Sequence, residues 1–229
     1  MLTIYGVPVS VHTRKVIVAA LEKKLEHRVE PIIPFSPPPG WDKLSATGKI
    51  PVVKDGDFTL QDSSVICAYL ERVHPSPALY PQAPRDYAQA LWFEEYADGT
   101  LFRDVIHGLF FQKIIRPNIL REKTDAAAVD RIEREALPAA FGYLDGALEG
   151  EYFAGGRFGI ADIAIVSNLV NFHYLGCQID PQAYPRLAAY FRRQLRRPSI
   201  EQAVQQAQPA AAAMGLDMAF VDYLGLAAV

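Results

Sequence analysis

The first thirty-three residues alternate between short apolar runs and a helical pattern. Leu2–Tyr5 is apolar and is followed by Gly6 and Pro8, which predicts a short strand and a turn. After Ser10, apolar residues recur at helical spacing as far as Glu22, and this spacing predicts a helix. Residues 28–33 predict a second strand. A strand–helix–strand unit of this length normally places its two strands parallel, with a right-handed connection.

Residues 50–71 combine a hairpin pattern with a helix start. The apolar run 50–53 is followed by the turn 54–57, in which Gly56 supplies a positive φ, and then by Phe58 and Leu60. This order predicts a β-hairpin. Polar residues 61–64 precede apolar residues at helical spacing, so we expect a helix to begin near Asp62. A short helical piece around residues 41–46 is expected to lead into the hairpin, so the first eighty residues predict the order β-α-β-α-β-β-α.

Pro51 is unusual at the start of the hairpin. Proline cannot donate a ladder hydrogen bond, so it belongs at the first residue or the edge of a strand. A cis bond before Pro51 would leave the backbone N–H and C=O of Ile50 open to an extended peptide. This arrangement predicts a place where a peptide-like ligand adds to the sheet.

Proline-rich segments divide the chain. Residues 34–40 predict a loop, and the four prolines within 74–84 indicate a boundary between domains. We assign residues 1–74 to a first domain, 75–84 to a linker and 85–229 to a second domain. Beyond the linker only helical spacing recurs, over residues 85–115, 125–148, 160–174 and 184–197, so the second domain is expected to be all-helical. The tail 207–229 is helical at first and then apolar, with Phe220, Tyr223 and Leu224.

Composition excludes several classes of protein. Half of the 229 residues are hydrophobic and 21% are charged, values typical of soluble globular proteins. The net charge of −3 argues against nucleic acid as a partner. No apolar run approaches the length of a membrane span or a signal peptide, so we expect neither, and a cytoplasmic location is compatible. Cys67 and Cys177 are far apart and predict no zinc site or disulfide.

The motifs in residues 48–71 resemble the glutathione-binding signature of the cytosolic glutathione transferase family. In that family a cis-proline starts a strand and an acidic residue with a serine opens the next helix. The resemblance extends to about residue 206 and implies an α/β thioredoxin-like domain followed by an all-α domain. It also implies glutathione as co-substrate and a homodimer.

The resemblance assigns roles to five residues in this stretch. Ile50 would hydrogen-bond the cysteinyl part of glutathione, and Pro51 would be the cis-proline. Asp62 would face the γ-glutamyl ammonium, and Ser63 would face the γ-glutamyl carboxylate at the helix start. Lys49 would reach the glycine carboxylate. Three of these residues also have an ordinary interpretation, as a helix cap for Asp62 and Ser63 and as a solvated side chain for Lys49.

Ser10 is the candidate for activating the thiol. A free thiol has a pKa near 8.5, so a hydrogen bond or a helix dipole must favour the thiolate. The run YGVPVSVHTRKV resembles the active-site loop of serine-type family members, including the phi, theta and related bacterial classes, and Ser10 matches their catalytic serine. Ser10 is equally a plausible helix cap. Tyr5 is the rival donor, because tyrosine-type members carry their hydroxyl near the end of the first strand.

The first long helix of the second domain is expected to supply the electrophile pocket. Its candidate wall residues are Phe102, His107, Phe110 and Phe111, although aromatic residues at helical spacing more often belong to a core. His12 and His107 are further candidates, but a lone histidine on a helix is usually solvated or buried in the core. The arginines at 186, 192, 193, 196 and 197 predict a solvated basic helix surface.

The run 158–164 resembles the family's helix-capping motif. Asp162 would accept a hydrogen bond from the backbone N–H of Gly159. The family usually carries Ser or Thr at the position of Gly159, so we expect a serine there to complete the cap and stabilise the helix slightly.

The sequence thus predicts an enzyme that conjugates glutathione to small apolar electrophiles. A glutathione-dependent isomerase or dehalogenase on the same fold is one alternative, because it would differ only in the second pocket. A non-catalytic relative that uses the fold for protein interaction or regulation is another. The presence of Ser10, Pro51, Asp62 and Ser63 together favours the enzyme.

Overall fold

A mixed four-stranded sheet forms the first part of the computed structural model, which describes residues 1–223. Its order is β2-β1-β3-β4, from β1 (Leu2–Tyr5), β2 (His27–Glu30), β3 (Val52–Asp55) and β4 (Phe58–Gln61). β1 is parallel to β2 and antiparallel to β3, and β3 and β4 form the predicted hairpin. The thioredoxin-like order of the first eighty residues is therefore confirmed.

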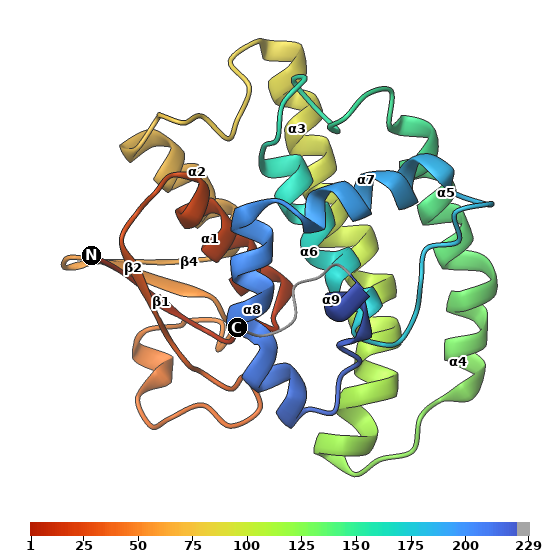
Figure 1. Cartoon of the computed structure of the whole chain (residues 1–229). Helices are drawn as coiled ribbons and strands as arrows, with labels where there is room; N and C mark the ends of the chain where they lie inside the picture. The colour runs from red at the N-terminus through yellow and green to blue at the C-terminus, as the bar shows by residue number, and fades with distance from the viewer. Residues whose placement is uncertain (224–229) are drawn as a thin grey trace.

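Three helices accompany the sheet. α1 (Val11–Glu22) joins β1 to β2, η1 (Trp41–Lys43) precedes β3, and α2 (Ser63–Val73) follows β4 (Figure 1). The Ile50–Pro51 bond is cis and Gly56 has φ +61°, both as expected. The second strand is shorter than predicted, because Pro31 and Pro34 lack the N–H that would extend its ladder.

The remainder of the described chain is helical. α3 (Pro84–Tyr96) runs directly into the π-helical segment η2 (Ala97–Leu120), and three consecutive segments follow: α4 (Ala126–Arg131), η3 (Ile132–Ala136) and α5 (Leu137–Ala147). The chain then forms α6 (Ile160–His173), α7 (Pro185–Leu195), α8 (Pro198–Ala213) and α9 (Ala219–Tyr223). The predicted all-helical second half is confirmed.

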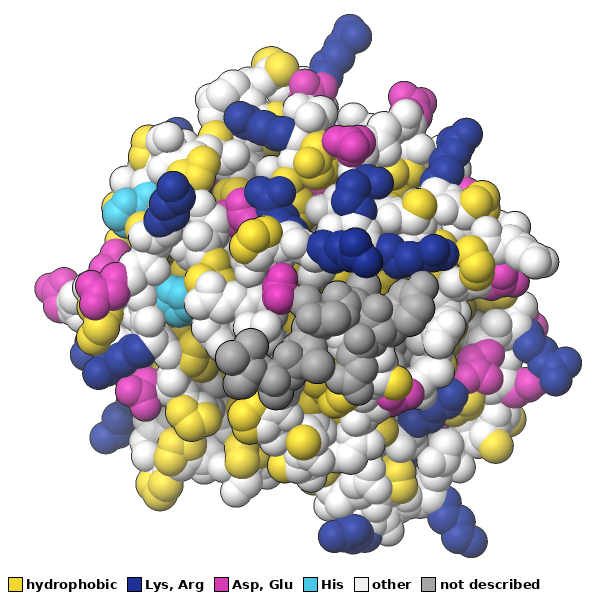
Figure 2. Space-filling model, in the orientation of Figure 1, with side chains coloured by type: hydrophobic (Ala, Val, Ile, Leu, Met, Phe, Trp, Pro, Cys, Tyr) yellow, Lys and Arg dark blue, Asp and Glu magenta, His cyan; other side chains and the backbone are white. Residues whose placement is uncertain are grey.

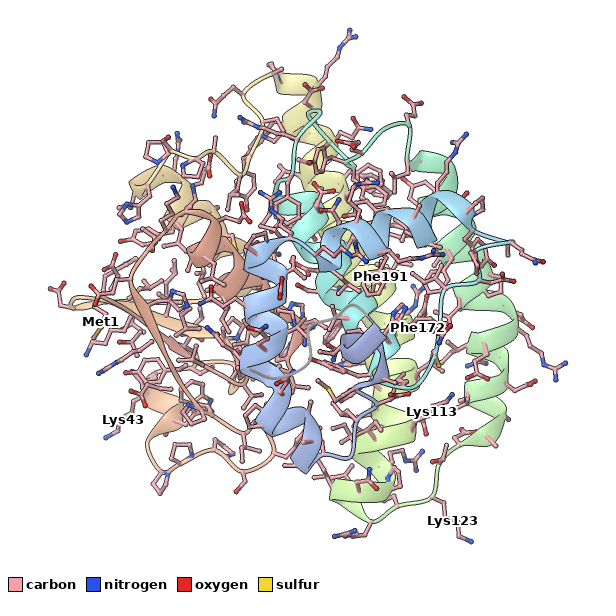
Figure 3. All side chains as sticks on the ribbon, viewed as in Figure 1. Met1, Lys43, Lys113, Lys123, Phe172 and Phe191 are labelled. Carbon is pink, nitrogen blue, oxygen red and sulfur yellow. The ribbon has the colours of Figure 1, made fainter. Side chains whose placement is uncertain are left out.

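α6 is the centre of the molecule. All fourteen of its residues are buried, and it packs against α1, α3 and η2 (Figure 1). Phe172 at its end and Phe191 of α7 are both buried, whereas Lys43 and Lys123 lie at the periphery (Figure 3). Because α6 contacts both α1 and η2, it holds the sheet-bearing half against the helical half.

Asp162 caps α6 from within the core. Its Oδ2 accepts the N–H of Gly159 at 3.0 Å, as predicted, and its Oδ1 accepts the N–H of Phe153 at 3.2 Å. The expectation that serine at position 159 would stabilise the helix is wrong. A Cβ at Gly159 would lie 2.5 Å from the carbonyl oxygen of Leu79, which itself accepts the N–H of Ile160. The packing of the linker therefore requires glycine here.

The basic surface late in the chain is solvated, as expected. Figure 2 shows Lys and Arg side chains gathered over α7. Arg186, Arg192, Arg193 and Arg196 are exposed, and Arg197 is partly buried because it pairs with Glu22 of α1 at 2.7 Å.

The C-terminal tail packs onto α6. α8 continues to Ala213, and Phe220 of α9 lies 5.4 Å from the ring of Tyr174. The predicted apolar contact of Leu224 falls outside the described residues. Within residues 1–223, no helix combines the length and the apolar character needed to cross a membrane.

Candidate active site

Ser10 caps the N-terminus of α1. It has an extended backbone, with φ −66° and ψ 129°, and its Oγ accepts the N–H of Thr13 at 3.4 Å. This hydrogen bond uses the oxygen as an acceptor, so the hydroxyl hydrogen stays available for a ligand. The cap and the predicted donor role of Ser10 are therefore compatible.

Asp62 caps the N-terminus of α2. Its Oδ1 accepts the N–H groups of Ser64 and Val65, at 3.0 and 3.2 Å. Asp62 has φ +73°, a conformation that side-chain-bearing residues rarely adopt and that is enriched at ligand sites. Since one oxygen makes both capping bonds and the side chain is exposed, Oδ2 remains free for a cation.

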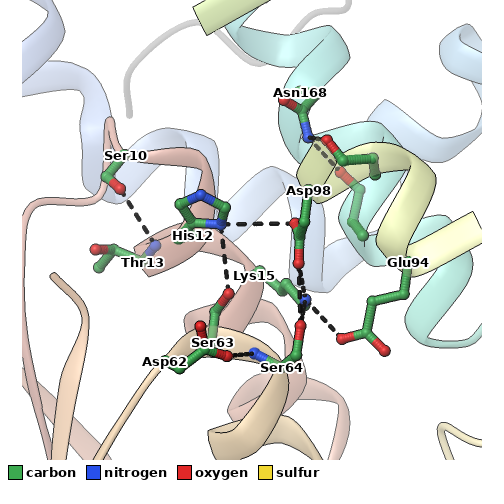
Figure 4. Close-up of polar contacts among 12 residues, drawn as sticks. Ser10, His12, Thr13, Lys15, Asp62, Ser63, Ser64, Glu94, Asp98 and Asn168 are labelled. Carbon is green, nitrogen blue, oxygen red and sulfur yellow. Dashed lines mark hydrogen bonds and ion pairs between the residues drawn. The ribbon is translucent and has the colours of Figure 1, made fainter. Parts of the chain in front are cut away.

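His12 brings the two helix starts together. Its Nδ1 lies 3.3 Å from Oγ of Ser63 and 3.5 Å from Oδ1 of Asp98 (Figure 4). His12 is two residues after Ser10, Ser63 opens α2, and Asp98 is in η2. These two contacts therefore join both N-termini to the helical half at one place.

A buried lysine extends this polar cluster. Nζ of Lys15 lies 2.6 Å from a carboxylate oxygen of both Glu94 and Asp98, and 2.8 Å from Oγ of Ser64 (Figure 4). Ser64 also donates to Asp98 at 3.0 Å. Lys15 thus bridges two acidic side chains beside Asp62 and Ser63.

Burial and charge shift the pKa values in the cluster. Burial lowers the pKa of His12 below its usual value, although Asp98 opposes the shift, so the ring is neutral at pH 7. Burial alone would lower the pKa of Lys15, but Glu94 and Asp98 outweigh it and raise that pKa. Burial raises the pKa of Glu94 against the effect of Lys15. Lys15 therefore stays charged.

The other predicted residues of the first domain lie around this centre. Lys49 is exposed, Ile50 is half-buried, and Pro51 is buried immediately before β3. Tyr5 ends β1, where it packs on Trp41 with ring centroids 6.2 Å apart. Tyr5 thus contacts the small apolar cluster under η1, and its role as the rival donor stays a prediction.

The four residues predicted to line the electrophile pocket do not all lie together. Phe102 lies 4.6 Å from the ring of His12 and 4.7 Å from the exposed His107. Phe111 is partly buried against the core, and Phe110 is only 6% exposed within it. Phe102 and His107 are therefore next to the polar cluster, whereas Phe110 serves the core.

Sequence reasoning missed part of the cluster. It treated His12 as an isolated histidine and did not select Lys15, Ser64, Glu94 or Asp98. One signal was available, because Lys15 interrupts the apolar face of the helix 11–22 and such a lysine needs a partner. Nothing local identifies Asp98, which is 83 residues away from Lys15. In the described part of the chain, no group of three or more His, Cys, Asp or Glu side chains is arranged to hold a metal ion.

The sheet, the helical half and two facing helix N-termini define a protein of the glutathione transferase type. Residues 4–78 match the model of the glutathione S-transferase N-terminal domain, and residues 126–193 match that of the C-terminal domain. Together these matches span more than half of the chain. The chain belongs to the glutathione transferase family.

Known proteins similar to this chain carry the same family name. The Escherichia coli K12 glutathione S-transferase GstB is 27% identical over 70% of this chain and 76% of its own. The Nicotiana tabacum glutathione S-transferase PARB is 26% identical over 90% of this chain and 98% of its own. The crystal structure of a Rhodospirillum rubrum F11 glutathione S-transferase superposes with a TM-score of 0.82 at 24% identity, covering 89% of this chain and 91% of that one.

Proposed function

We propose that this protein conjugates the thiolate of glutathione to small apolar electrophiles, as a serine-type member of its family. The contact between Ser63 and His12 carries the proposal, because it brings the start of α2 to the start of α1. A ligand lying across these two ends would meet Asp62 and Ser63 at one end and Ser10 at the other.

The groups at the start of α2 would hold the γ-glutamyl part of glutathione. The free oxygen of Asp62 would pair with the γ-glutamyl ammonium. Ser63 and the first N–H groups of α2 would receive the γ-glutamyl carboxylate. Ile50 would align the cysteinyl backbone, and the exposed Lys49 would meet the glycine carboxylate.

Ser10 would favour the thiolate by donating its hydroxyl hydrogen to the glutathione sulfur. The cap geometry supports this role, since Oγ accepts from Thr13 while its O–H is unused. The N-terminal end of α1 adds a positive dipole at the same point. The thiolate would then attack the electrophile, forming the carbon–sulfur bond as the leaving group departs.

The electrophile would lie against Phe102 and His107. Phe102 is half-buried and its ring packs at a tilt against that of His12, so an apolar substrate there would be next to the start of α1. Phe111 lies further along η2 and would contribute to a deeper wall. This placement favours aromatic or other flat apolar electrophiles.

Binding and turnover test the proposal together. Purified protein should be retained on immobilised glutathione and should conjugate glutathione to an activated chloro-nitroarene faster than the uncatalysed reaction. Retention without turnover across a panel of chloro-nitroarenes, epoxides and alkyl halides would instead favour the non-catalytic alternative. A protein that neither binds glutathione nor turns over would contradict the proposal.

We also propose that the protein is a homodimer. Each half carries an apolar patch: Phe58, Val65 and the partly buried Tyr69 on β4 and α2, and Trp92, Tyr143 and the partly buried Tyr96 on α3 and α5. A two-fold arrangement would place one patch of each protomer on the other patch of its partner. Sedimentation should give a dimer that Trp92→Arg weakens, whereas a monomeric wild type at micromolar concentration would contradict this proposal.

A further inference from the structure

Arg14 is a fully buried cation, with 0% of its surface exposed, between α1 and α6. Its guanidinium donates to the carbonyl oxygen of Ser167 and to Oδ1 of Asn171, both at 2.8 Å, and to the carbonyl oxygen of Val9 at 3.2 Å. The guanidinium also lies 5.4 Å from the ring of Tyr174. Every one of these partners is neutral.

Lys15, the next residue in the chain, is a second buried cation, but its surroundings differ from those of Arg14. Lys15 is 1% exposed and is paired with both Glu94 and Asp98. Arg14 has no carboxylate partner among residues 1–223. Burial lowers the pKa of Arg14, yet a guanidinium remains protonated in proteins. The fold therefore holds one full positive charge that no described group offsets.

Arg14 is positioned to act on Ser10. Ser10 is the N-cap of α1 and Arg14 lies in its first turn, where the backbone N–H of Arg14 donates to the carbonyl oxygen of Ser10 at 2.8 Å. Helical side chains lean toward the N-terminus, and the guanidinium reaches back as far as the carbonyl of Val9, which precedes Ser10. The guanidinium charge thus contacts the backbone of the residue before Ser10, at the end of the helix where the thiol would bind.

We propose that Arg14 is a positioning residue for the reaction, whose uncompensated charge favours the thiolate form of a thiol bound beside Ser10. The proposal rests on the proposed function of the site. The thiol loses its proton to solvent water, and no other bond changes. The thiolate would supply the negative charge that the α1–α6 interface lacks.

The other charges near Ser10 do not replace Arg14. In α1, His12 is neutral at pH 7, and the charge of Lys15 is offset by Glu94 and Asp98. Asp62 at the start of α2 is negative and disfavours a thiolate. Tyr174, the residue that follows α6, lies against Arg14, and burial raises the pKa of its phenol, so it stays neutral.

Asn171 offers a test that keeps Arg14 in place. In Asn171→Asp, a carboxylate would replace the amide whose oxygen is 2.8 Å from the guanidinium, and the new ion pair would cancel most of the field at Ser10. Asn171→Ala is the matched control, because it removes the same hydrogen bond without adding a charge. Arg14→Gln removes the cation, and Arg14→Lys retains it.

The measurement is the pKa of glutathione's thiol in the complex, followed by the ultraviolet absorbance of the thiolate. Asn171→Asp and Arg14→Gln should each raise this pKa by about one unit, since an opposite charge at short range shifts a pKa by about 1–3 units. Asn171→Ala and Arg14→Lys should leave it near the wild-type value, and KM for glutathione should change little.

Two outcomes separate this inference from the proposed function. If the wild type lowers the thiol pKa and Asn171→Asp lowers it equally, the role of Arg14 is overturned while the proposed function stands. Equal increases in Asn171→Asp and Asn171→Ala would also overturn it, because the hydrogen bond rather than the charge would then be responsible. A wild type that does not bind glutathione contradicts the proposed function itself. Asn171→Asp keeps the test decisive even if Arg14→Gln does not fold.

Discussion

The phenolic hydroxyl of Tyr190 in α7 donates a hydrogen bond to Oδ1 of Asp162 in α6, at 2.9 Å. Both side chains are fully buried. Burial and the charge of Asp162 raise the pKa of Tyr190 well above its usual value, so the phenol remains a donor. With the N–H groups of Gly159 and Phe153, the carboxylate has three donors and holds α6, α7 and the preceding loop together.

Tyr190→Phe should destabilise the protein by about 1.5–3 kcal/mol at neutral pH, because it removes a hydrogen bond to a buried carboxylate. Urea denaturation measures the change. Tyr184→Phe is the control, since Tyr184 packs edge-on against Phe141 and is only partly buried. Equal stability of Tyr190→Phe and wild type would show that the hydroxyl contributes nothing.

The stability of the fold should depend on pH through Asp162. Burial raises the pKa of Asp162 to about 6 from 3.8, although its three hydrogen bonds oppose the shift. A raised folded-state pKa means that the folded protein binds the proton more tightly than the unfolded chain. The stabilisation that comes from binding this proton is complete below pH 3.8, the ordinary pKa of Asp. It is lost as the pH rises through about 6.

Asp162→Asn isolates this effect, because the other titrating groups are common to both proteins. Between pH 7.5 and pH 5, the free energy of unfolding of wild type should rise by about 1 kcal/mol relative to Asp162→Asn. A constant difference across this range would mean that Asp162 does not titrate there.

Gly159→Ala and Gly159→Ser should both destabilise the protein, by about 1–3 kcal/mol, because the new Cβ would overlap the carbonyl oxygen of Leu79. Gly142→Ala is the matched control, since Gly142 lies inside α5 with open space around it. That substitution should stabilise the protein by about 0.5–1 kcal/mol. A higher melting temperature for Gly159→Ser than for wild type would mean that the linker backbone at Leu79 can move enough to make room for the side chain.

Asp62→Asn should raise KM for glutathione roughly tenfold or more, with little change in kcat. Asparagine tolerates a positive φ and can cap α2 through its carbonyl oxygen, so the substitution removes the charge but keeps the cap. A charge-assisted hydrogen bond is worth about 1.5–3 kcal/mol. Initial rates against glutathione concentration provide the test, and an unchanged KM would exclude Asp62 from the site.

Ser10→Ala should shift the pH–rate profile with a chloro-nitroarene upward by about one unit or more, because the donor to the sulfur is lost. Ser10→Thr should keep partial activity, since its hydroxyl survives with an added methyl group. Tyr5→Phe should have a much smaller effect. If Tyr5→Phe shifts the profile and Ser10→Ala does not, Tyr5 is the donor instead.

Local chemistry was enough to predict the elements of the first half and several of their ends. Helical spacing, the turn glycine at Gly56 and the caps at Ser10 and Asp62 act over a few residues, so the sequence carries them directly. The contact of Asp162 with Gly159 was predictable for the same reason, since only three residues separate them.

Tertiary packing alone decided how these elements meet. Asp98 reaches Lys15 across 83 residues, Asn171 reaches Arg14 across 157, and Leu79 occupies the space that a side chain at Gly159 would need. No local pattern encodes these distances, because they depend on how α6 and η2 pack against α1. The sequence therefore determined the two helix starts that define the candidate site. The packing of the helices decided which charges surround them, and it leaves Arg14 without a carboxylate partner among the described residues.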